Sequence, residues 1–517
     1  MKNFVEIMDT TLRDGEQTQN VSFTPEEKLH IAKLLLGKLN VPRIEVSSAR
    51  VSEGEKNSVK LITKWAKKNN MRDKVEVLGF VDGGKSIDWI REAGGRVLNL
   101  LTKGSLKHLK GQLGKTPKQH FQDIAKVIQY AHSHRFVVNV YMEDWSNGYR
   151  DSRDYSYDMT QFLIEAGARR IMLPDTLGVM VPREVYEALC DLTERFPNAH
   201  FDFHPHNDYG LGTANVLEAI RGGAKGVHAT VNCLGERTGN AALEQIVPGI
   251  HDHLKKKTGV KEKYLYLISH VVETFSGKRV AANAPIVGED VFTQTAGIHA
   301  DGDKKGGLYE NPLKPDRFGR TRQYALGKLA GKASLEQNLK RLGMELSPEN
   351  FNKVLQKIIE LGDQKKIVTP EELPFIISDV LDLPEEKAVR IKQVSILSGK
   401  GIAPVCTMSI EYKGNVSKVT GSGDGGYDAF MTALRAWAKK NHIDLPTLKD
   451  YEVRIPPGGK TSALVECKIT WDYRLMGKQK DFMFSDLTTR GLNPDQTMAA
   501  VEATEKMLNI LLGKTKP

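Results

Sequence analysis

Two histidines separated by one residue, His204 and His206, are the first candidates for chemistry in this sequence. On a β-strand, residues i and i+2 project from the same face, so both imidazoles can converge on one ion. Asp14 follows another short β-like run and can add a carboxylate. Nitrogen and oxygen ligands suit divalent ions, and open coordination positions suit catalysis. The pattern predicts a divalent-metal site holding Mn²⁺ or Zn²⁺, with Mg²⁺ and Co²⁺ as alternatives.

The elements that must hold these residues alternate along the first half of the chain. Short β-branched runs are separated by amphipathic helical stretches, which is typical of α/β folds with a parallel sheet. Eight strand–helix units predict a TIM (β/α)₈ barrel over residues 1–262. A doubly wound sheet is disfavoured because no glycine-rich dinucleotide turn follows the first strand. The expected strands are Val5–Asp9, Arg43–Ser47, Val75–Phe80, Val97–Thr102, Val137–Glu143, Arg170–Asp175, His200–His206 and Gly226–Val231.

The first helix of the barrel has a clear start. Thr24 can cap it, Pro25 suits the first helical position, and Glu27 can complete a capping box. We therefore expect the helix to begin at Pro25.

Beyond the barrel the pattern changes twice. Residues 263–388 contain helical segments joined by glycine-rich loops and predict helical linker subdomains, with a helix start at Thr369-Pro370-Glu371-Glu372. Residues 389–517 contain a βββα unit twice, with helices at Tyr427–Lys440 and Asp495–Leu512. This repeat predicts a separate C-terminal α+β domain.

Composition and charge argue against several classes of protein. Hydrophobic residues make up 40% and charged residues 27%, which is ordinary for a globular chain, and no apolar run approaches the length of a membrane span. The net charge is +10, but the lysines are scattered, so we expect neither a nucleic-acid nor a membrane partner. The four widely spaced cysteines suit reduced thiols, and the N-terminus lacks a signal peptide, which predicts a cytoplasmic protein.

Ionisable and amide side chains gather where the expected strands end. Arg13 follows the first strand, Glu143 ends the fifth, Thr176 follows the sixth, and Asn240 follows the eighth. The carboxyl ends of barrel strands meet at the catalytic face. We therefore expect an active site around the histidine pair at that face.

Four motifs of the chain resemble those of one enzyme family, namely DTTLRDGEQ at residues 9–17, HPHND at 204–208, GERTGNAALE at 235–244 and GIHADG at 297–302. They are similar to the α-isopropylmalate, homocitrate and citramalate synthases, and the C-terminal domain resembles the regulatory domain of two of these groups. The resemblance implies an acyltransferase that condenses acetyl-CoA with a 2-oxo acid on a divalent metal. The metal ligands it implies are Asp14, His204, His206 and Asn240. The substrate and catalytic residues it implies are Arg13, Glu143, Thr176 and His299.

The chemistry of these residues agrees with that implied reaction. A metal can polarise the keto group of the 2-oxo acid, and Arg13 can stabilise the charge that develops on its oxygen; a structural ion pair is the alternative for Arg13. Thr176 can hydrogen-bond the carboxylate. Glu143 can orient acetyl-CoA or take part in proton transfer. The alternative is a carboxylate that only hydrogen-bonds a residue holding the metal. The resemblance assigns removal of the acetyl proton to His299 of a neighbouring subunit, which implies a homodimer; a loop histidine with local partners is the alternative.

The choice of 2-oxo acid depends on the end of the fifth strand. Isopropylmalate-forming members typically carry a serine two places before the strand-five glutamate, whereas this chain has Tyr141. Its ring would crowd the pocket for the substrate's alkyl group, and Leu78 and Leu101 would close it further, unless both leucines are ordinary barrel packing. A hydrophobic pocket rejects extra bulk well. We therefore expect pyruvate, with 2-oxoisovalerate as the alternative that an isopropylmalate synthase would use.

The C-terminal domain is expected to sense an end product. The condensation product of pyruvate leads towards isoleucine, and the resemblance implies feedback inhibition by that amino acid. Tyr427 and Asp428 follow a glycine pair that offers free amide donors. Strand residues that could line a branched side chain, or simply form the domain core, are Leu448, Tyr451, Ile455 and Val465.

Two other classes of function are less favoured. Hydroxymethylglutaryl-CoA lyases share the barrel and the histidine pair but carry a cysteine in a GGCP-like motif after strand eight. Here the segment Gly235–Asn240 has no cysteine, and Cys233 lies too early. A barrel that only displays a ligand-binding C-terminal domain would not need the complete metal and arginine set.

Overall fold

The computed structural model describes residues 3–295, 298, 301–302, 306, 308–341, 344–363, 368, 373–381, 388–454, 465–472 and 486–512. The chain divides into two compact units. The first comprises Met1–Phe292 and Glu310–Arg322, and the second comprises Thr293–Tyr309 and Gln323–Pro517. The domain boundaries expected after residues 262 and 388 stay a prediction.

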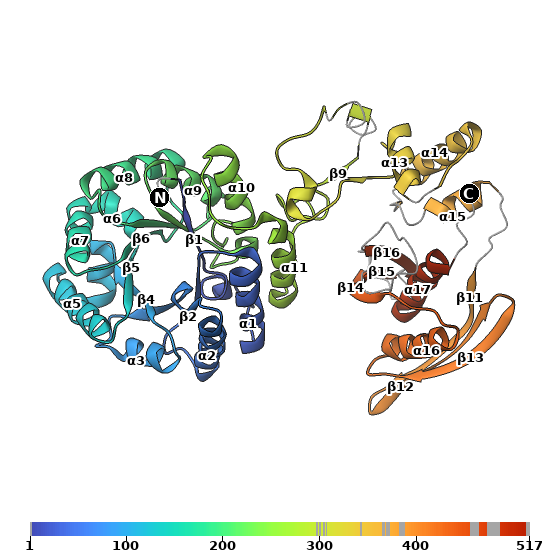
Figure 1. Cartoon of the computed structure of the whole chain (residues 1–517), viewed down its shortest axis with the longest axis horizontal. Helices are drawn as coiled ribbons and strands as arrows, with labels where there is room; N and C mark the ends of the chain where they lie inside the picture. The colour runs from blue at the N-terminus through green and yellow to red at the C-terminus, as the bar shows by residue number, and fades with distance from the viewer. Residues whose placement is uncertain are drawn as a thin grey trace. The chain divides into compact units, whose positions relative to one another are not determined.

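The first unit contains a closed parallel barrel in the order β1 to β8, which confirms the predicted TIM-barrel fold. Helices surround the ring of strands (Figure 1). The strands are β1 Glu6–Asp9, β2 Arg43–Ser48, β3 Val75–Phe80, β4 Val97–Lys103, β5 Val137–Glu143, β6 Arg170–Asp175, β7 Phe201–Pro205 and β8 Gly226–Ala229.

Several helices of the first unit begin where the sequence provides caps. Thr24 and Glu27 form the predicted capping box, with Pro25 as the first helical residue, and Thr116 forms a second capping box with Gln119. Such caps satisfy amide groups that have no partner inside the helix. The helices are α1 Pro25–Lys33, α2 Glu53–Lys68, α3 Lys85–Glu92, α4 Leu106–His108, α5 Pro117–Ser133, α6 Trp145–Asp151, α7 Arg153–Glu165, α8 Pro182–Arg195, α9 Gly212–Arg221, α10 Leu243–His253 and α11 Leu265–Ser276.

The last two strands of the barrel are shorter than predicted. His206 lies just beyond β7 and makes an isolated antiparallel bridge with Asn240. After β8 a 3₁₀ turn covers Val231–Cys233, with Asn232 at a φ of 57°. This left-handed turn leads the chain away from the sheet, so that the following loop can fold back over the end of β7.

Helices and two short strands form the first part of the second unit. The elements are β9 Thr293–Gln294, β10 Gln323–Tyr324, α13 Lys332–Arg341, α14 Pro348–Asp363 and α15 Leu373–Val380. The parallel pair β9–β10 was not foreseen, because two-residue strands have no measurable periodicity. The helix start expected at 369–372 lies outside the described residues.

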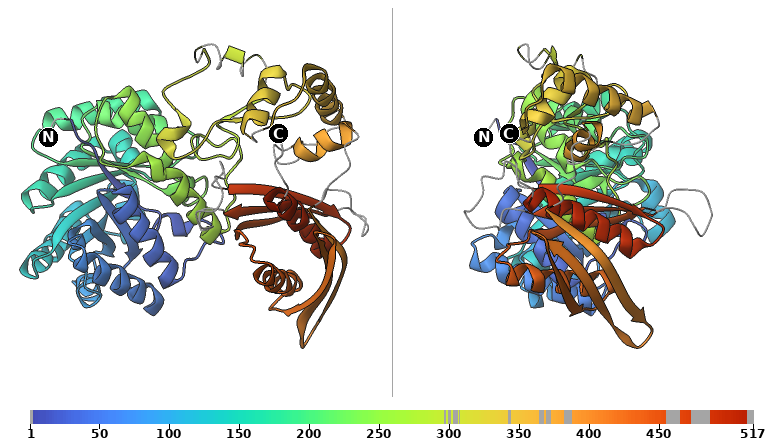
Figure 2. Two further views of the ribbon diagram at one scale, coloured as in Figure 1. Left: turned by 45° about the vertical axis from the view of Figure 1, so that its right-hand side comes forward. Right: turned by 90° about the vertical axis from the view of Figure 1, so that its right-hand side faces the viewer.

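The last part of the second unit is the predicted repeat of three strands and a helix. Both sheets are antiparallel, in the orders β11-β12-β13 and β14-β15-β16, and Figure 2 shows α16 lying against one face of the curved first sheet. Trp437 and Trp471 are buried in their common core. The elements are β11 Val389–Gly399, β12 Ile402–Tyr412, β13 Asn415–Ser422, α16 Gly426–Lys440, β14 Thr447–Arg454, β15 Val465–Asp472, β16 Asp486–Asn493 and α17 Gln496–Leu512.

Candidate metal and active site

Asp14, His204 and His206 come together at the carboxyl ends of β1 and β7. All three are buried, and each offers a ligand atom such that these atoms lie within 4.8 Å of one another. The Nε2 atom of His204 lies 3.0 Å from Oδ2 of Asp14. The spacing of one residue between the histidines therefore brings both imidazoles to one point, as strand geometry requires.

Asn240 joins this group through the loop after β8. Its bridge with His206 is followed by a backbone hydrogen bond from Asn207 N to Gly239 O of 2.9 Å. Gly239 has a φ of 89°, and a Cβ there would lie 1.6 Å from the carbonyl oxygen of Cys233. Only glycine fits this turn, which places the side chain of Asn240 beside the histidines.

Two buried polar atoms of this group have no hydrogen-bond partner among the described residues. They are Nδ1 of His206 and Oδ1 of Asn240. Leaving buried acceptors unsatisfied costs about 1–3 kcal/mol each. A divalent cation would satisfy carboxylate, imidazole and amide ligands of this kind. The residues present therefore fit a metal, and "the metal site" below denotes these four candidate ligands, Asp14, His204, His206 and Asn240.

The electrostatics of the metal site favour cation binding. Burial opposes ionisation of Asp14, but the neighbouring Arg13 guanidinium and the His204 imidazole hold the pKa of its carboxyl well below the usual range. Burial lowers the pKa of His206 to about 4, so this imidazole is neutral near pH 7. An ionised carboxylate and a neutral imidazole are the forms that bind metals.

Arg13 lies between the metal site and the barrel interior. Its Nη1 is 3.2 Å from Oδ1 of Asp14, and its Nε donates to Oε2 of Glu45 at 2.5 Å. Its Nη2 donates to the hydroxyl of Tyr141 at 3.2 Å. Because three groups fix the guanidinium, Arg13 presents a rigid positive charge at the edge of the metal site.

Tyr141, Leu78 and Leu101 come together, as the pocket hypothesis requires. Tyr141 and Leu78 share a small buried apolar cluster with Met8 and Met172, and Leu101 packs against it. The ring of Tyr141 lies edge-on to His204, with the centroids 5.7 Å apart. Tyr141 thus borders His204 from the inside of the barrel, and Leu78 and Leu101 belong to the apolar cluster around it.

The structure describes the contacts of Thr176 and Glu143 but not those of His299. The hydroxyl of Thr176 accepts a hydrogen bond from Asp144 N at 2.9 Å. The carboxylate of Glu143 forms an ion pair with Lys103, a partner that the sequence did not indicate. His299 lies outside the described residues. The predicted roles of all three stay predictions.

His228 is a neighbour of the metal site that sequence reasoning missed. It is fully buried on β8, and its Nδ1 lies 3.1 Å from Nδ1 of His204. Its Nε2 lies 3.2 Å from Oδ2 of Asp202. Burial lowers its pKa to about 3, although Asp202 opposes this, so the ring is neutral. Strand alternation could have indicated that His228 faces the barrel interior, but a single histidine gave no reason to look.

Cys233 has the surroundings of a structural thiol. Its Sγ donates to Asn240 O at 2.7 Å and accepts from Nδ2 of Asn207 at 3.4 Å. Burial raises the pKa of this thiol to about 11. The protonated thiol therefore supports the loop that carries Asn240. A structural role for Cys233 agrees with the expectation that the lyase class is less favoured.

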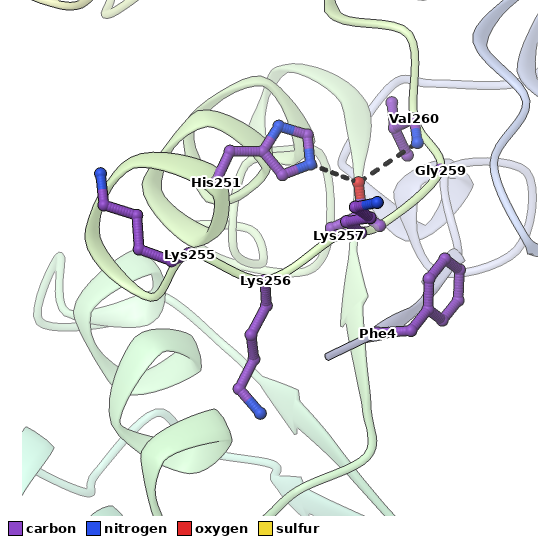
Figure 3. A pocket seen from close by; sticks show the side chains of 8 residues that line it. Phe4, His251, Lys255, Lys256, Lys257, Gly259 and Val260 are labelled. Carbon is purple, nitrogen blue, oxygen red and sulfur yellow. Dashed lines mark hydrogen bonds between the residues drawn. The ribbon is translucent and has the colours of Figure 1, made fainter. Parts of the chain in front are cut away.

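A surface hollow of about 560 Å³ lies at the opposite end of the barrel. Phe4 precedes β1, and Lys255, Lys256 and Lys257 follow α10 (Figure 3). His251 Nε2 and the backbone amide of Val260 both contact the Thr258 hydroxyl there, at 2.9 and 3.2 Å. The hollow contains none of the predicted site residues.

The predicted effector residues Tyr427 and Asp428 begin helix α16. The hydroxyl of Tyr427 lies 2.8 Å from Oγ1 of Thr504, and its ring centroid is 5.2 Å from that of Tyr451. Oδ2 of Asp428 accepts from Asp424 N at 3.1 Å. Both side chains therefore already have partners at the start of the helix.

A β-bulge brings two further effector candidates to one face of their sheet. The register shifts between Leu448 and Asp450, so that Leu448 pairs with Trp471 and Tyr451 pairs with Ile469. Leu448 is 43% exposed, whereas Val465 is buried. Ile455 lies outside the described residues.

Comparison with known proteins identifies the family. The HMGL-like family model matches residues 4–272, which is more than half of the chain. This chain belongs to the HMGL-like family. The homocitrate synthase post-HMGL domain-like model matches residues 286–366, and the LeuA allosteric (dimerisation) domain model matches residues 367–512.

Relatives that match nearly the whole of this HMGL-like protein include synthases of two kinds. A putative (R)-citramalate synthase from Methanopyrus kandleri is 33% identical over 514 residues, covering 99% of this chain and 97% of the relative. An (R)-citramalate synthase from Methanocaldococcus jannaschii is 34% identical, covering 98% and 99%. A 2-isopropylmalate synthase from the same organism is 33% identical, covering 99% and 95%. The chain belongs to this group of synthases and is an acyltransferase.

No helix among the described residues is long and apolar enough to cross a bilayer.

Proposed function

We propose that this enzyme condenses acetyl-CoA with pyruvate to give (R)-citramalate and CoA. The observation that carries the proposal is the position of Tyr141. Its buried ring borders the metal site and packs with Leu78 and Met172, so space for the substrate's alkyl group is restricted. Pyruvate has only a methyl group to place there, whereas 2-oxoisovalerate has a branched isopropyl group.

The side chains of this site can support each requirement of such a condensation. A divalent ion held by the metal site would polarise the keto group of pyruvate. The guanidinium of Arg13 is fixed beside Asp14 and can stabilise negative charge developing on the keto oxygen. Thr176 has a hydroxyl proton available to a substrate carboxylate, because its oxygen accepts from Asp144. Glu143 and His299 keep their predicted roles at the acetyl-CoA end.

A thiol-release assay with a panel of 2-oxo acids tests this proposal. Purified enzyme with Mn²⁺ and acetyl-CoA should release CoA fastest with pyruvate, more slowly with 2-oxobutanoate and slowest with 2-oxoisovalerate. A preference for 2-oxoisovalerate would instead indicate a 2-isopropylmalate synthase, which is the name of a relative of similar identity.

We further propose that the C-terminal domain binds isoleucine and inhibits the barrel. The domain matches an allosteric dimerisation family, and Tyr427, Asp428, Leu448 and Tyr451 lie on α16 and β14 of its two repeats. Allosteric coupling is typically worth 1–3 kcal/mol, or about 5- to 150-fold in affinity. The same domain would pair two subunits into a homodimer, and four free cysteines fit a cytoplasmic location.

Inhibition curves with isoleucine and leucine test the regulatory proposal. Tyr427→Ala should raise the isoleucine concentration for half inhibition by about 5-fold or more, with uninhibited turnover retained. Lys440→Ala at the other end of α16 is the matched control and should leave the curve unchanged. Wild-type enzyme that ignores isoleucine, or responds only to leucine, would overturn this assignment.

A further inference from the structure

His228 connects the metal site to a buried carboxylate below it. Its ring lies edge-on to His204, with centroids 5.2 Å apart, and one ring nitrogen faces His204 while the other faces Asp202. Both His228 and Asp202 are fully buried. The three side chains therefore form a continuous chain from β7 to β8 and back to β7.

The charge of Asp202 determines the direction of the hydrogen bonds in this chain. Arg43 forms an ion pair with Asp202, so the carboxylate is ionised and can only accept. Nε2 of His228 must then donate to Asp202, and a neutral imidazole has no second proton. Nδ1 of His228 is therefore an acceptor facing Nδ1 of His204.

This arrangement suits the tautomer of His204 that a metal ligand needs. When His204 binds an ion through Nε2, the nitrogen 3.0 Å from Oδ2 of Asp14, its ring proton must lie on Nδ1, and Nδ1 of His228 is 3.1 Å away to accept it. The hydroxyl of Tyr141 also lies 3.3 Å from Nδ1 of His228, but it can donate to Glu45 instead, at 3.3 Å. His204 thus has His228 as the acceptor for its Nδ1 proton.

We propose that His228, held by Asp202, is a positioning residue that fixes the tautomer and ring orientation of the metal ligand His204. The inference rests on the metal site of the proposed function. Hydrogen-bond partners of metal-ligating histidines commonly take this role, and their loss costs about 10- to 100-fold in metal affinity. Here the partner is a second histidine, with the carboxylate one step further away.

Three substitutions at His228 separate positioning from simple packing. His228→Asn places an amide oxygen near the position of Nδ1 and keeps the acceptor for His204. His228→Gln can reach Asp202 with its amide but moves the acceptor away from His204. His228→Leu removes both contacts at similar volume. His200→Asn is the matched control, because His200 contacts the other oxygen of Asp202 at 3.0 Å without forming part of the chain to His204.

The readout is the affinity of metal-free enzyme for Co²⁺, followed by its visible absorption, and for Mn²⁺ by calorimetry. Wild type, His200→Asn and His228→Asn should bind within a few-fold of one another. His228→Gln and His228→Leu should bind about 10- to 100-fold more weakly, with an altered Co²⁺ spectrum. Thermal unfolding of the metal-free proteins identifies variants that fail to fold. If His228→Leu is one of them, the comparison of His228→Asn with His228→Gln decides the test.

Two outcomes would overturn different statements. If His228→Gln binds Co²⁺ as tightly as wild type, or more tightly than His228→Asn, His228 does not position His204 and the inference fails. If wild type and Asp14→Asn bind Co²⁺ equally weakly, the metal site itself is wrong, and the proposed function fails independently of His228.

Discussion

The two ends of the barrel interior differ in how their buried polar groups are paired. At the amino ends of the strands, Arg43 forms ion pairs with Glu6, Glu76 and Asp202, and Arg170 pairs with Glu6; we call these five residues the lower ion cluster. At the carboxyl ends, Arg13 pairs with Asp14, while Nδ1 of His206 and Oδ1 of Asn240 are buried without a hydrogen-bond partner among the described residues.

The pKa values of the buried carboxyl groups depend on whether a cation lies beside them. In the lower ion cluster, burial opposes ionisation of Asp202, but Arg43 and hydrogen bonds from His200 and His228 hold its pKa well below the usual range. Near the upper end, Asp9 and Glu244 lack such a cation, and burial raises the pKa of each to about 7. The comparison teaches that a buried carboxyl group keeps its charge where the fold places a cation beside it, as for Asp202 and Asp14, and tends to keep its proton where it does not, as for Asp9 and Glu244.

The largest effect is expected from removing charge at the metal site. Asp14→Asn keeps the side-chain size but loses the carboxylate that attracts the cation, so turnover should fall by about a thousandfold or more while the barrel still folds. CoA release and thermal unfolding measure the two quantities. Asp123→Asn on the surface of α5 is the control. An Asp14→Asn enzyme with full activity would contradict the division between the two ends.

The lower ion cluster should respond in stability. Arg43→Met leaves Glu76 and Asp202 buried without their cation, which should lower the free energy of unfolding by about 3–5 kcal/mol. Arg50→Met is the control, because Arg50 is exposed and its ion pair with Asp82 is worth at most about 1 kcal/mol. Denaturant unfolding measures both. Equal losses in the two variants would remove the distinction between buried and exposed pairs.

Glu244 offers a pH test of a buried carboxylate without a cation. Its pKa is raised from 4.5 to about 7, so the folded state keeps its proton longer than the unfolded state. Between these two pH values the contribution of this group to stability should fall by up to about 3 kcal/mol as pH rises. Glu244→Gln, which retains an oxygen for Asn232 N, should therefore match wild type near pH 4 and exceed it at pH 8.

Unfolding at several pH values checks this, with exposed Glu194→Gln as the control. A Glu244→Gln variant that is less stable than wild type at pH 8 would show that the carboxylate is compensated by a partner.

The smallest effect is expected in specificity. Tyr141→Ser removes the ring that restricts the pocket, so catalytic efficiency with pyruvate relative to 2-oxoisovalerate should fall tens-fold, since contacts of this size are worth about 1–3 kcal/mol. Tyr141→Phe is the matched control, because it keeps the bulk and loses only the contacts of the hydroxyl with Arg13, Glu45 and His228. It should lose efficiency but keep the preference for pyruvate. A preference changed by Tyr141→Phe would assign specificity to the hydroxyl and not to the ring.

The sequence by itself determined the elements of this protein. Period-two and helical spacing located all eight barrel strands to within about two residues, and Thr24 and Glu27 marked the start of α1. These patterns are local, because strand alternation, caps and prolines act over a few residues. The pair His204 and His206 was predicted for the same reason, since two residues on one strand face fix their own geometry.

Only the tertiary structure decided which distant side chains meet. The lower ion cluster joins residues from five strands, the bridge of His206 with Asn240 depends on a left-handed turn after β8, and the bulge after Leu448 changes which residues share a face. No local period encodes such contacts. His228 is the clearest case, because a lone histidine on a strand has no pattern of its own. Its orientation between His204 and Asp202 follows from closure of the barrel, which brings β7 and β8 side by side.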